Sequence, residues 1–337
     1  MGTDLRVGVL GATGAVGGEI VKVLDQVGWR PTSLVALARS STATIHVEYG
    51  AERVPVDDWK DEALEGLDLL FVAVPREAGR AAGEAALRAG VQMIDCSGAF
   101  ALDADVPLAV PWINPESLSE APRGIVAVPD PSAVLVASVL GPLRRAGIDG
   151  AAEATLLVPA SREGRAGIDE LSRQVVALFN SGTPPRKVFP RGLAFDLLPT
   201  VGAVGEDGWT DAEHRVVAEV ERIVGPGPLE VTLVGVPVFS GLSGGVVLRP
   251  DRPVMPDLVA RLLEDGGVRV PIEMGVRGLP RPRKVEGTPF AHAGRIRVAH
   301  DGRTLHVWLS MDNLRTAATA AVASAAIVLQ VGRDTAH

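Results

Sequence analysis

Apolar and polar positions follow two different patterns along the chain, and these patterns divide it into two parts. In the first part, largely apolar runs at residues 5–10 and 67–75, each with one charged residue at its second position, are followed by segments with helical character at residues 20–27 and 78–90. Largely apolar runs of this length are typical of strands that are buried on both faces. Strands that alternate with helices predict a doubly wound, parallel α/β sheet with right-handed crossovers.

The pattern changes from about Gly150, where longer strand-like runs are joined by few helices. Helices are expected at residues 167–180 and 210–225, and the C-terminal segment is a strong helix former. Grouped strands with few helices predict an α+β domain with a mixed or antiparallel sheet. The strand-like runs are residues 151–161, 229–241, 244–250, 292–302 and 304–313.

We therefore expect two domains. The first comprises residues 1–130 together with 314–337, and the second comprises residues 131–313. The motif Pro129-Asp130-Pro131-Ser132 lies at the boundary, just before a long apolar stretch. It predicts a helix N-terminus, which is a common position for a nucleophile. Ser132 is expected to help cap this helix.

A glycine motif lies between the first strand and the first helix. Gly11, Gly14 and Gly17 follow a G-x-x-G-x-x-G spacing in the strand-to-helix context that a dinucleotide-binding, Rossmann-type domain requires. Gly11 allows the tight turn, Gly14 lets the backbone approach a pyrophosphate, and Gly17 allows close packing of helix on strand. The N–H groups of the first helical turn, with Ala15 and Val16, would face the phosphate. The alternative is a glycine-rich turn with no ligand.

The second strand, residues 33–40, ends in Arg39 and Ser40 rather than in an acidic residue. An acidic residue at this place would bind a ribose 2′-hydroxyl, whereas an arginine suits a 2′-phosphate. Arg39 and Ser40 therefore favour NADP(H) over NAD(H). An exposed loop arginine without a ligand is the alternative interpretation.

Composition excludes several classes of protein. The 337 residues are 47% hydrophobic and 22% charged, with a net charge of −8, which argues against nucleic acid or an anionic membrane as the main partner. No signal sequence or membrane span is expected, so a cytoplasmic location is predicted. The single cysteine, Cys96, excludes an intramolecular disulfide, and the six histidines show no metal-ligand spacing.

Six motifs follow one another along the chain. They are GVLGATGAVG, IDCSGAFALDADVPLAVPWINPESL, SREGRAGIDEL, LAFDLLPTVG, GVPVFSGLSG and GRIRVAHDG with the following LHVWLSMDNLRTAATAAV. Their order and spacing resemble those of aspartate-semialdehyde dehydrogenases, and most of all those of the Usg-1-like branch. The resemblance implies an enzyme that uses NADP and phosphate to interconvert an aldehyde and an acyl phosphate through a cysteine thioester, and that forms a homodimer.

The resemblance also shows which chemical groups this chain lacks. Pro131 stands at the position of the nucleophilic cysteine, and Leu242 at that of the histidine acid/base. Gly235 replaces the arginine that would bind the substrate carboxylate, and Ala101 replaces the arginine that would bind phosphate. The resemblance therefore implies a pseudoenzyme with respect to the family's chemistry.

Other positions match the family in part. Asn313 and Thr13 match residues expected beside the cofactor, and Arg215 falls where the family has a lysine on the phosphate side, although a solvated helix face would also explain it. The S-G-A-G loop expected near the nicotinamide contains Arg162 and Glu163 here. These two large side chains stand where small ones admit the nicotinamide ring and so conflict with NADP(H) binding.

Two residues are alternative nucleophiles. A further parallel strand is expected within residues 91–100, and Cys96 lies where it ends, but no histidine is near Cys96 in sequence. Ser132 would need the general base that Leu242 has replaced. Three interpretations follow: a homologue without dehydrogenase activity that keeps the fold, dimer and NADP(H) binding; an NADP-dependent oxidoreductase with altered chemistry; and the family activity by another route. The sequence names neither a natural ligand nor a partner.

Overall fold

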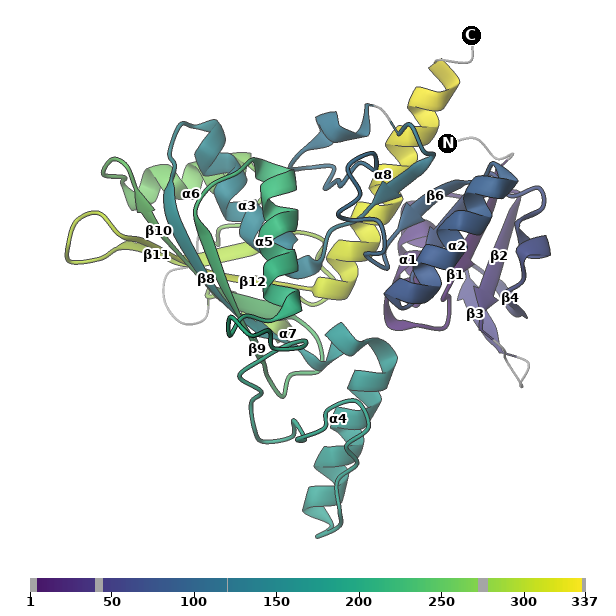
Figure 1. Ribbon diagram of the computed structural model, residues 1–337, viewed down its shortest axis with the longest axis horizontal. Coiled ribbons are helices and arrows are strands. Elements are labelled where there is room, and N and C mark those ends of the chain that lie inside the picture. Colours follow the sequence, from purple (N-terminus) through teal and green to yellow (C-terminus); the bar gives the residue numbers. More distant parts are fainter. Residues whose placement is uncertain (1–4, 40–44, 120, 272–277, 335–337) are drawn as a thin grey trace. The chain divides into compact units, whose positions relative to one another are not determined.

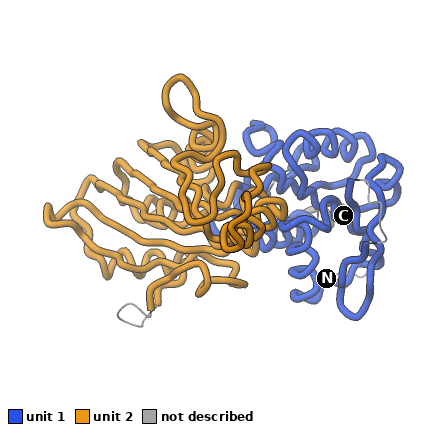
Figure 2. Tube along the Cα trace, turned by 90° about the horizontal axis from the view of Figure 1, so that it is seen from below, with its two compact units in different colours: residues 1–129, 317–337 blue, residues 130–316 orange. Residues whose placement is uncertain are grey.

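The computed structural model divides the chain into two compact units, residues 1–129 with 317–337 and residues 130–316 (Figure 2). We describe each unit by itself. The structure describes residues 5–39, 45–119, 121–271 and 278–334. Among these residues, every helix is too short or too polar to span a membrane.

Unit 1 is built on a seven-stranded sheet in the order β3-β4-β2-β1-β5-β6-β7 (Figure 1). All neighbouring strands are parallel except β3 and β4, so the predicted doubly wound sheet is confirmed, with an antiparallel edge that was not predicted. Gly50 has a φ of 60° in the short turn between β3 and β4, a geometry that joins two antiparallel strands. The strands are β1 (Arg6–Leu10), β2 (Ser33–Ala38), β3 (His46–Tyr49), β4 (Glu52–Asp58), β5 (Leu69–Val72), β6 (Gln92–Asp95) and β7 (Ile125–Ala127).

Alternate residues of each strand point to opposite faces of this sheet. Their apolar side chains are covered by helices. Val7 and Phe71 belong to one core cluster together with Ile20 of α1 (Ala15–Gln26) and Ala318 of α8 (Asn313–Asp334). By contrast, α2 (Arg76–Ala89) packs against residues outside that cluster, because a Cβ added at Gly83 would meet Phe100 and Met93. The unit also contains the short 3₁₀ helices η1 (Asp61–Leu64) and η2 (Pro115–Leu118).

Unit 2 contains a five-stranded sheet in the order β11-β12-β10-β8-β9. Strands β8 and β9 are parallel and the other pairs are antiparallel, which confirms the predicted mixed sheet. The burial pattern alternates along β8, so one face of the sheet carries the core. The strands are β8 (Gly150–Val158), β9 (Leu229–Gly235), β10 (Leu242–Pro250), β11 (His292–Val298) and β12 (Leu305–Met311).

The core face of this sheet is covered by helices. The first, α3 (Pro131–Arg145), is buried along most of its length, and contacts α5 (Asp211–Val224), α6 (Pro256–Asp265) and β10. The sequence predicted α5 but no element where α6 lies. The remaining helices are η3 (Ala160–Glu163), α4 (Gly164–Phe179) and α7 (Pro282–Val285).

Candidate functional site

The glycine motif of unit 1 forms a tight turn at the carboxyl end of the parallel sheet. The N–H of Gly11 donates to the carbonyl of Leu37, at the end of β2, over 2.8 Å. Gly11 has a φ of 88°, and a Cβ at this residue would lie 2.3 Å from the carbonyl oxygen of Ala73. Gly11 is therefore required both by its left-handed backbone and by the close approach of the neighbouring strand.

The other two glycines bring the first turn of α1 onto this loop. Gly14 is the N-cap of α1 and donates its N–H to Gly11 over 2.8 Å. A Cβ at Gly17 would lie 2.1 Å from the carbonyl oxygen of Gly11, so no larger residue fits there. Ala15 and Val16 lie in the first helical turn and are partly exposed. This arrangement presents the positive end of α1 without side chains in the way, which suits an anion such as a pyrophosphate.

Thr13 lies in this turn and Arg39 follows the neighbouring strand β2. Thr13 is an exposed residue of the turn itself. Arg39 is exposed and follows β2, two residues after the carbonyl that holds Gly11. Ser40 lies outside the described residues.

Cys96 follows β6 in the same unit and is partly buried against the core. Burial, together with the negative charge of Asp95, raises the pKa of the Cys96 thiol far above its usual range. The neighbouring loop winds around the carboxylate of Asp95, which accepts N–H bonds from Ser97 over 2.8 Å and Phe100 over 3.0 Å. Ala101, which the resemblance assigns to the position of the family's phosphate-binding arginine, is fully buried.

The motif that introduces α3 begins this helix as predicted, but with a different capping residue. Asp130 is the N-cap, and its carboxylate accepts the backbone N–H of Ser132 over 2.8 Å. Ser132 was expected to cap the helix; instead, it is the residue whose N–H is capped, because it lies inside the first turn. Pro131 occupies the first helical position, where the absence of an N–H causes no loss.

Arg162 approaches this turn from η3. Its Nη1 donates to Oδ2 of Asp130 over 2.6 Å, and both side chains are largely buried. Burial opposes ionisation of Asp130, but the charge of Arg162 and the bonds from Ser132 outweigh it and hold the pKa of Asp130 below its usual range. The charge of Asp130 in turn raises the pKa of Arg162. Arg162 therefore serves as an internal counter-ion to Asp130.

A second carboxylate completes a four-residue charge network. Glu219 of α5 accepts the backbone N–H of Asp130 at Oε2 over 2.6 Å and the Nε–H of Arg215 at Oε1 over 2.8 Å. Burial, and then the nearby charge of Asp130, raises the pKa of Glu219 to about 7. The side chain of Arg215 is only 12% exposed, so the alternative of a solvated helix face is wrong for this residue. We call Asp130, Arg162, Arg215 and Glu219 the charge network.

Leu242 and Asn313 lie together elsewhere in unit 2. Leu242 is buried at the start of β10, in register with Met311 of β12. Next to it, the N–H of Gly241 donates to Oδ1 of Asn313 over 3.0 Å, and Nδ2 of Asn313 donates to Oγ of Ser161 over 3.0 Å. Asn313 thus links the loop before Leu242 to the loop that carries Arg162.

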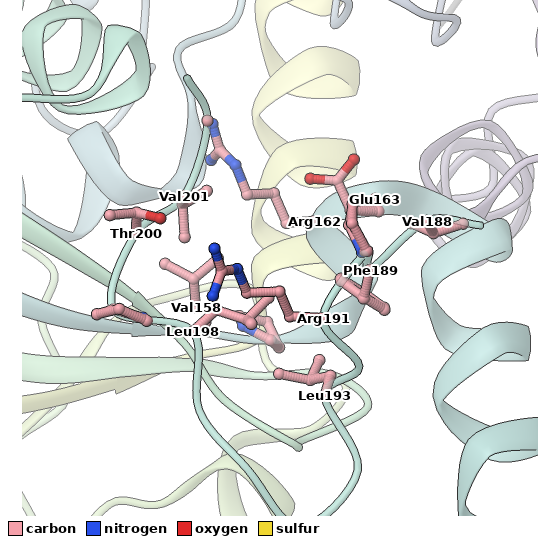
Figure 3. A pocket seen from close by; sticks show the side chains of 15 residues that line it. Val158, Arg162, Glu163, Val188, Phe189, Arg191, Leu193, Leu198, Thr200 and Val201 are labelled. Carbon is pink, nitrogen blue, oxygen red and sulfur yellow. The ribbon is translucent and has the colours of Figure 1, made fainter. Parts of the chain in front are cut away.

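A cavity of about 620 Å³ opens beside Arg162 (Figure 3). Its wall includes Glu163, Gly235 and Arg191, of which only Glu163 and Gly235 were singled out from the sequence. Arg191 was missed because nothing in its local sequence distinguishes it from other loop arginines. Apolar side chains form most of the remaining wall: Val158, Val188, Phe189, Leu193, Leu198 and Val201.

The structure therefore brings the predicted residues together in separate groups. Gly11, Gly14 and Gly17 form one turn in unit 1. Pro131 and Ser132 lie at the charge network, which includes the predicted Arg215. The partners Asp130 and Glu219 were not predicted as site residues. Within the described ranges, no group of three or more His, Cys, Asp and Glu residues could hold a metal ion.

Comparison with known protein families gives two matches. Residues 6–121 match the model described as "Semialdehyde dehydrogenase, NAD binding domain". Residues 140–316 match the model described as "Semialdehyde dehydrogenase, dimerisation domain". Together these matches cover most of both units.

Individual proteins resemble the chain over nearly its whole length. A USG-1 protein homolog from Pseudomonas aeruginosa is 33% identical, over 94% of this chain and 95% of that protein. An aspartate-semialdehyde dehydrogenase from Streptomyces akiyoshiensis is 32% identical, over 93% of this chain and 95% of that protein. The crystal structure of aspartate semialdehyde dehydrogenase II from Vibrio cholerae, complexed with ASA, is 28% identical, covers 98% of this chain and 99% of that one, and superposes with a TM-score of 0.91.

Proposed function

The chain belongs to the aspartate-semialdehyde dehydrogenase family, and we propose that it is a Usg-1-like member that has lost the dehydrogenase activity while keeping NADP(H) binding and a homodimer. The observation that carries this proposal is the first turn of α3. The resemblance puts the nucleophilic cysteine at Pro131, and a proline has no nucleophilic side chain. The side chains around this turn are engaged with one another in the charge network.

The thioester route needs a thiolate that attacks the aldehyde and an acid/base that moves its protons. Leu242 has no titratable group and is buried in a strand pair, so it does not replace the family's histidine. The raised pKa of Cys96 keeps its thiol protonated at neutral pH, which makes it a poor nucleophile. Ser132 is buried, and the neighbouring Asp130 carboxylate is already occupied by Arg162 and the Ser132 N–H. These observations support loss of the thioester chemistry.

The glycine turn supports retained dinucleotide binding. A Cβ at Gly11 or Gly17 would fill the space that lets the loop and α1 approach each other, so the sequence at this turn fits a pyrophosphate. We expect Gly14, Ala15 and Val16 to face the pyrophosphate, and Arg39 to favour NADP(H) through the 2′-phosphate. When bound, NADP(H) would supply a hydride. Arg162, however, is a large side chain fixed by Asp130 in the loop that the family places near the nicotinamide, so we expect binding without hydride transfer.

The test combines binding and turnover. NADPH is titrated by fluorescence, and phosphate-dependent NADP reduction is assayed with aspartate semialdehyde. We expect saturable NADPH binding and no turnover. Arg39→Ala should weaken the binding of NADPH more than it weakens the binding of NADH. Turnover that is lost in Cys96→Ala would overturn the proposal and make Cys96 the nucleophile. No NADPH binding would leave a structural or interaction role only.

A stepwise restoration tests the assignment of the lost positions. Pro131→Cys alone should remain inactive, because Leu242 provides no proton acceptor. A variant that combines Pro131→Cys and Leu242→His restores the nucleophile and the acid/base, and it leaves Gly235 unchanged because a side chain there would meet Leu198. Thioester formation from the acyl phosphate, in which the cysteine takes the acyl group and inorganic phosphate leaves, needs no hydride transfer and is expected by mass spectrometry only in the combined variant. The same reaction in the unaltered chain would contradict the proposal.

The homodimer is proposed from the family match of unit 2 to a dimerisation domain. Sedimentation velocity tests it directly, since a dimer has twice the 35.1 kDa mass of the chain. A single species at the monomer mass at micromolar concentration would remove this part of the proposal and leave the rest intact.

A further inference from the structure

The cavity beside Arg162 in unit 2 is lined mostly by residues to which the family chemistry assigns no role. Most of its side chains come from the segment around residues 188–202 and from the ends of β8 and β9. At about 620 Å³ it lies in the size range of small-molecule sites. Its wall combines apolar side chains with few charged ones, which is the composition typical of a ligand site rather than of a solvent-filled surface groove.

The position of the lost substrate arginine lies in this wall. A Cβ at Gly235 would lie 3.2 Å from Cβ of Leu198, and Leu198 and Gly235 are joined by two backbone hydrogen bonds of 2.9 and 2.8 Å. A side chain as long as arginine would therefore have to displace Leu198. At the end of β9, the space beside Gly235 is filled by the apolar side chain of Leu198. The positive charge of the cavity therefore comes from another segment.

That charge comes from Arg191. Figure 3 shows its side chain running into the cavity toward Val158 and Val201. Arg191 forms no salt bridge with any described carboxylate, whereas the other arginine of the wall, Arg162, is neutralised by Asp130 at 2.6 Å. The only carboxylate in the wall is that of Glu163, which is exposed to solvent. Arg191 is thus the one cation of the wall whose charge is available to a ligand.

We propose that this cavity binds a small monocarboxylate with an apolar body, and that Arg191 binds its carboxylate. A guanidinium binds a carboxylate through two parallel N–H bonds, while the aliphatic and aromatic wall removes the body of the ligand from water. Inorganic phosphate has no apolar part that could contact the apolar side chains of the wall. A neutral apolar molecule would leave the charge of Arg191 without an anion. The inference goes beyond the proposed function and does not depend on NADP(H) binding.

Isothermal titration calorimetry of the full chain without NADP(H) tests the proposal. The probes are 4-phenylbutyrate and hexanoate, with 4-phenylbutyramide and inorganic phosphate as controls. We expect one carboxylate per chain and binding of the amide at least tenfold weaker, since the amide cannot form a charge-assisted bidentate contact with Arg191. Equal binding of acid and amide, or no binding of either carboxylate, would overturn the proposal.

Variants locate the site. Arg191→Leu should weaken 4-phenylbutyrate binding about tenfold, and Arg191→Lys should weaken it less because a single charge remains. The matched control is Arg186→Leu, an exposed arginine of the same segment that does not line the cavity. Glu163→Gln should tighten binding about twofold by removing a solvent-screened repulsion. Binding that is unchanged in Arg191→Leu, or lost equally in Arg186→Leu, would refute the assignment. NADPH titration of the same variants is a separate readout, so failure of either proposal is distinguishable.

Discussion

The glycine turn before α1 and the turn before α3 solve the same structural problem in opposite ways. Each starts a helix after a strand of the parallel sheet. The first turn depends on missing side chains, because a Cβ at Gly17 would lie 2.1 Å from a backbone oxygen. The second depends on side chains, because the carboxylates of Asp130 and Glu219 bind its backbone N–H groups.

This difference teaches which parts of a family fold can change. A backbone that leaves no room for a Cβ accepts only glycine, so the residue type follows from the geometry. A turn held by side chains accepts any set of groups that satisfies its N–H donors and balances its charges. The α3 turn therefore keeps its helix with Pro131 at the first helical position. Each prediction below tests one side of this contrast.

The largest effect is expected at the glycine turn. Gly17→Ala should reduce the free energy of unfolding of unit 1 by about 4 kcal/mol, because the new Cβ meets backbone atoms that cannot move independently. The matched control is Gly18→Ala in the same helix, whose Cβ would lie at an ordinary 3.4 Å from Ala12. Urea denaturation and NADPH titration should show the control near wild type. If both variants behave alike, steric exclusion is not the reason for Gly17.

The next effect is expected at the charge network. Arg162→Leu should destabilise unit 2 by about 3 kcal/mol, because Asp130 would keep a largely buried charge without its counter-ion. Adding Asp130→Asn should recover part of this loss, since asparagine still caps α3 and carries no charge. Urea denaturation of both single variants and the double variant gives the coupling energy. Additive losses would show that the ion pair does not act as a unit.

The pH dependence of stability should reveal Glu219. Its pKa is about 7 in the folded chain and near its ordinary value of 4.5 when unfolded, so the folded state binds the extra proton between these values. The resulting stabilisation is fully present below pH 4.5 and is lost as the pH rises through 7. Glu219→Gln should remove this decline, which is on the order of 3 kcal/mol. A pH profile that is identical in the variant would show that Glu219 does not carry the shift.

The smallest effect is expected at the N-terminus of α5, which carries Arg215 and Glu219. Thr210 and Glu213 form a reciprocal capping box, with bonds of 3.1 and 2.8 Å. Thr210→Ala should reduce stability by about 1 kcal/mol, and Thr210→Ser should restore most of it. Thermal unfolding distinguishes these outcomes. A loss as large as that of Arg162→Leu would mean that the cap also positions the charge network.

The contrast also explains how much the sequence predicted. The apolar runs and the glycine spacing predicted the parallel sheet, because strand burial and helix packing are local patterns. Pro131 and Leu242 were assigned to the family's catalytic positions by the resemblance to its motifs, and this assignment stays a prediction. The edge strand β3 and helix α6 were not predicted, since four residues show little periodicity and α6 begins in a segment without a recognised motif.

The partners in the candidate site could not be predicted from local sequence. From the sequence, Arg162 was interpreted only as an obstacle to the nicotinamide. In the structure it also binds Asp130, which lies 32 residues earlier in the chain. Glu219 is 89 residues from the N–H that it binds. Such contacts depend on the tertiary packing of α3, η3 and α5. Arg191 belongs to the same class, because its role follows only from the wall that surrounds it.

The parallel pairing of β8 with β9 has a consequence for how unit 2 folds. Parallel neighbours cannot be joined by a hairpin, so residues 159–228, with α4 and α5, must close a long loop before β9 reaches β8. Loop closure of this length loses chain entropy before any contact between the strands is gained, so β9 is expected to join the sheet late. Until it joins, the edge of β8 stays unpaired and open to association with other chains.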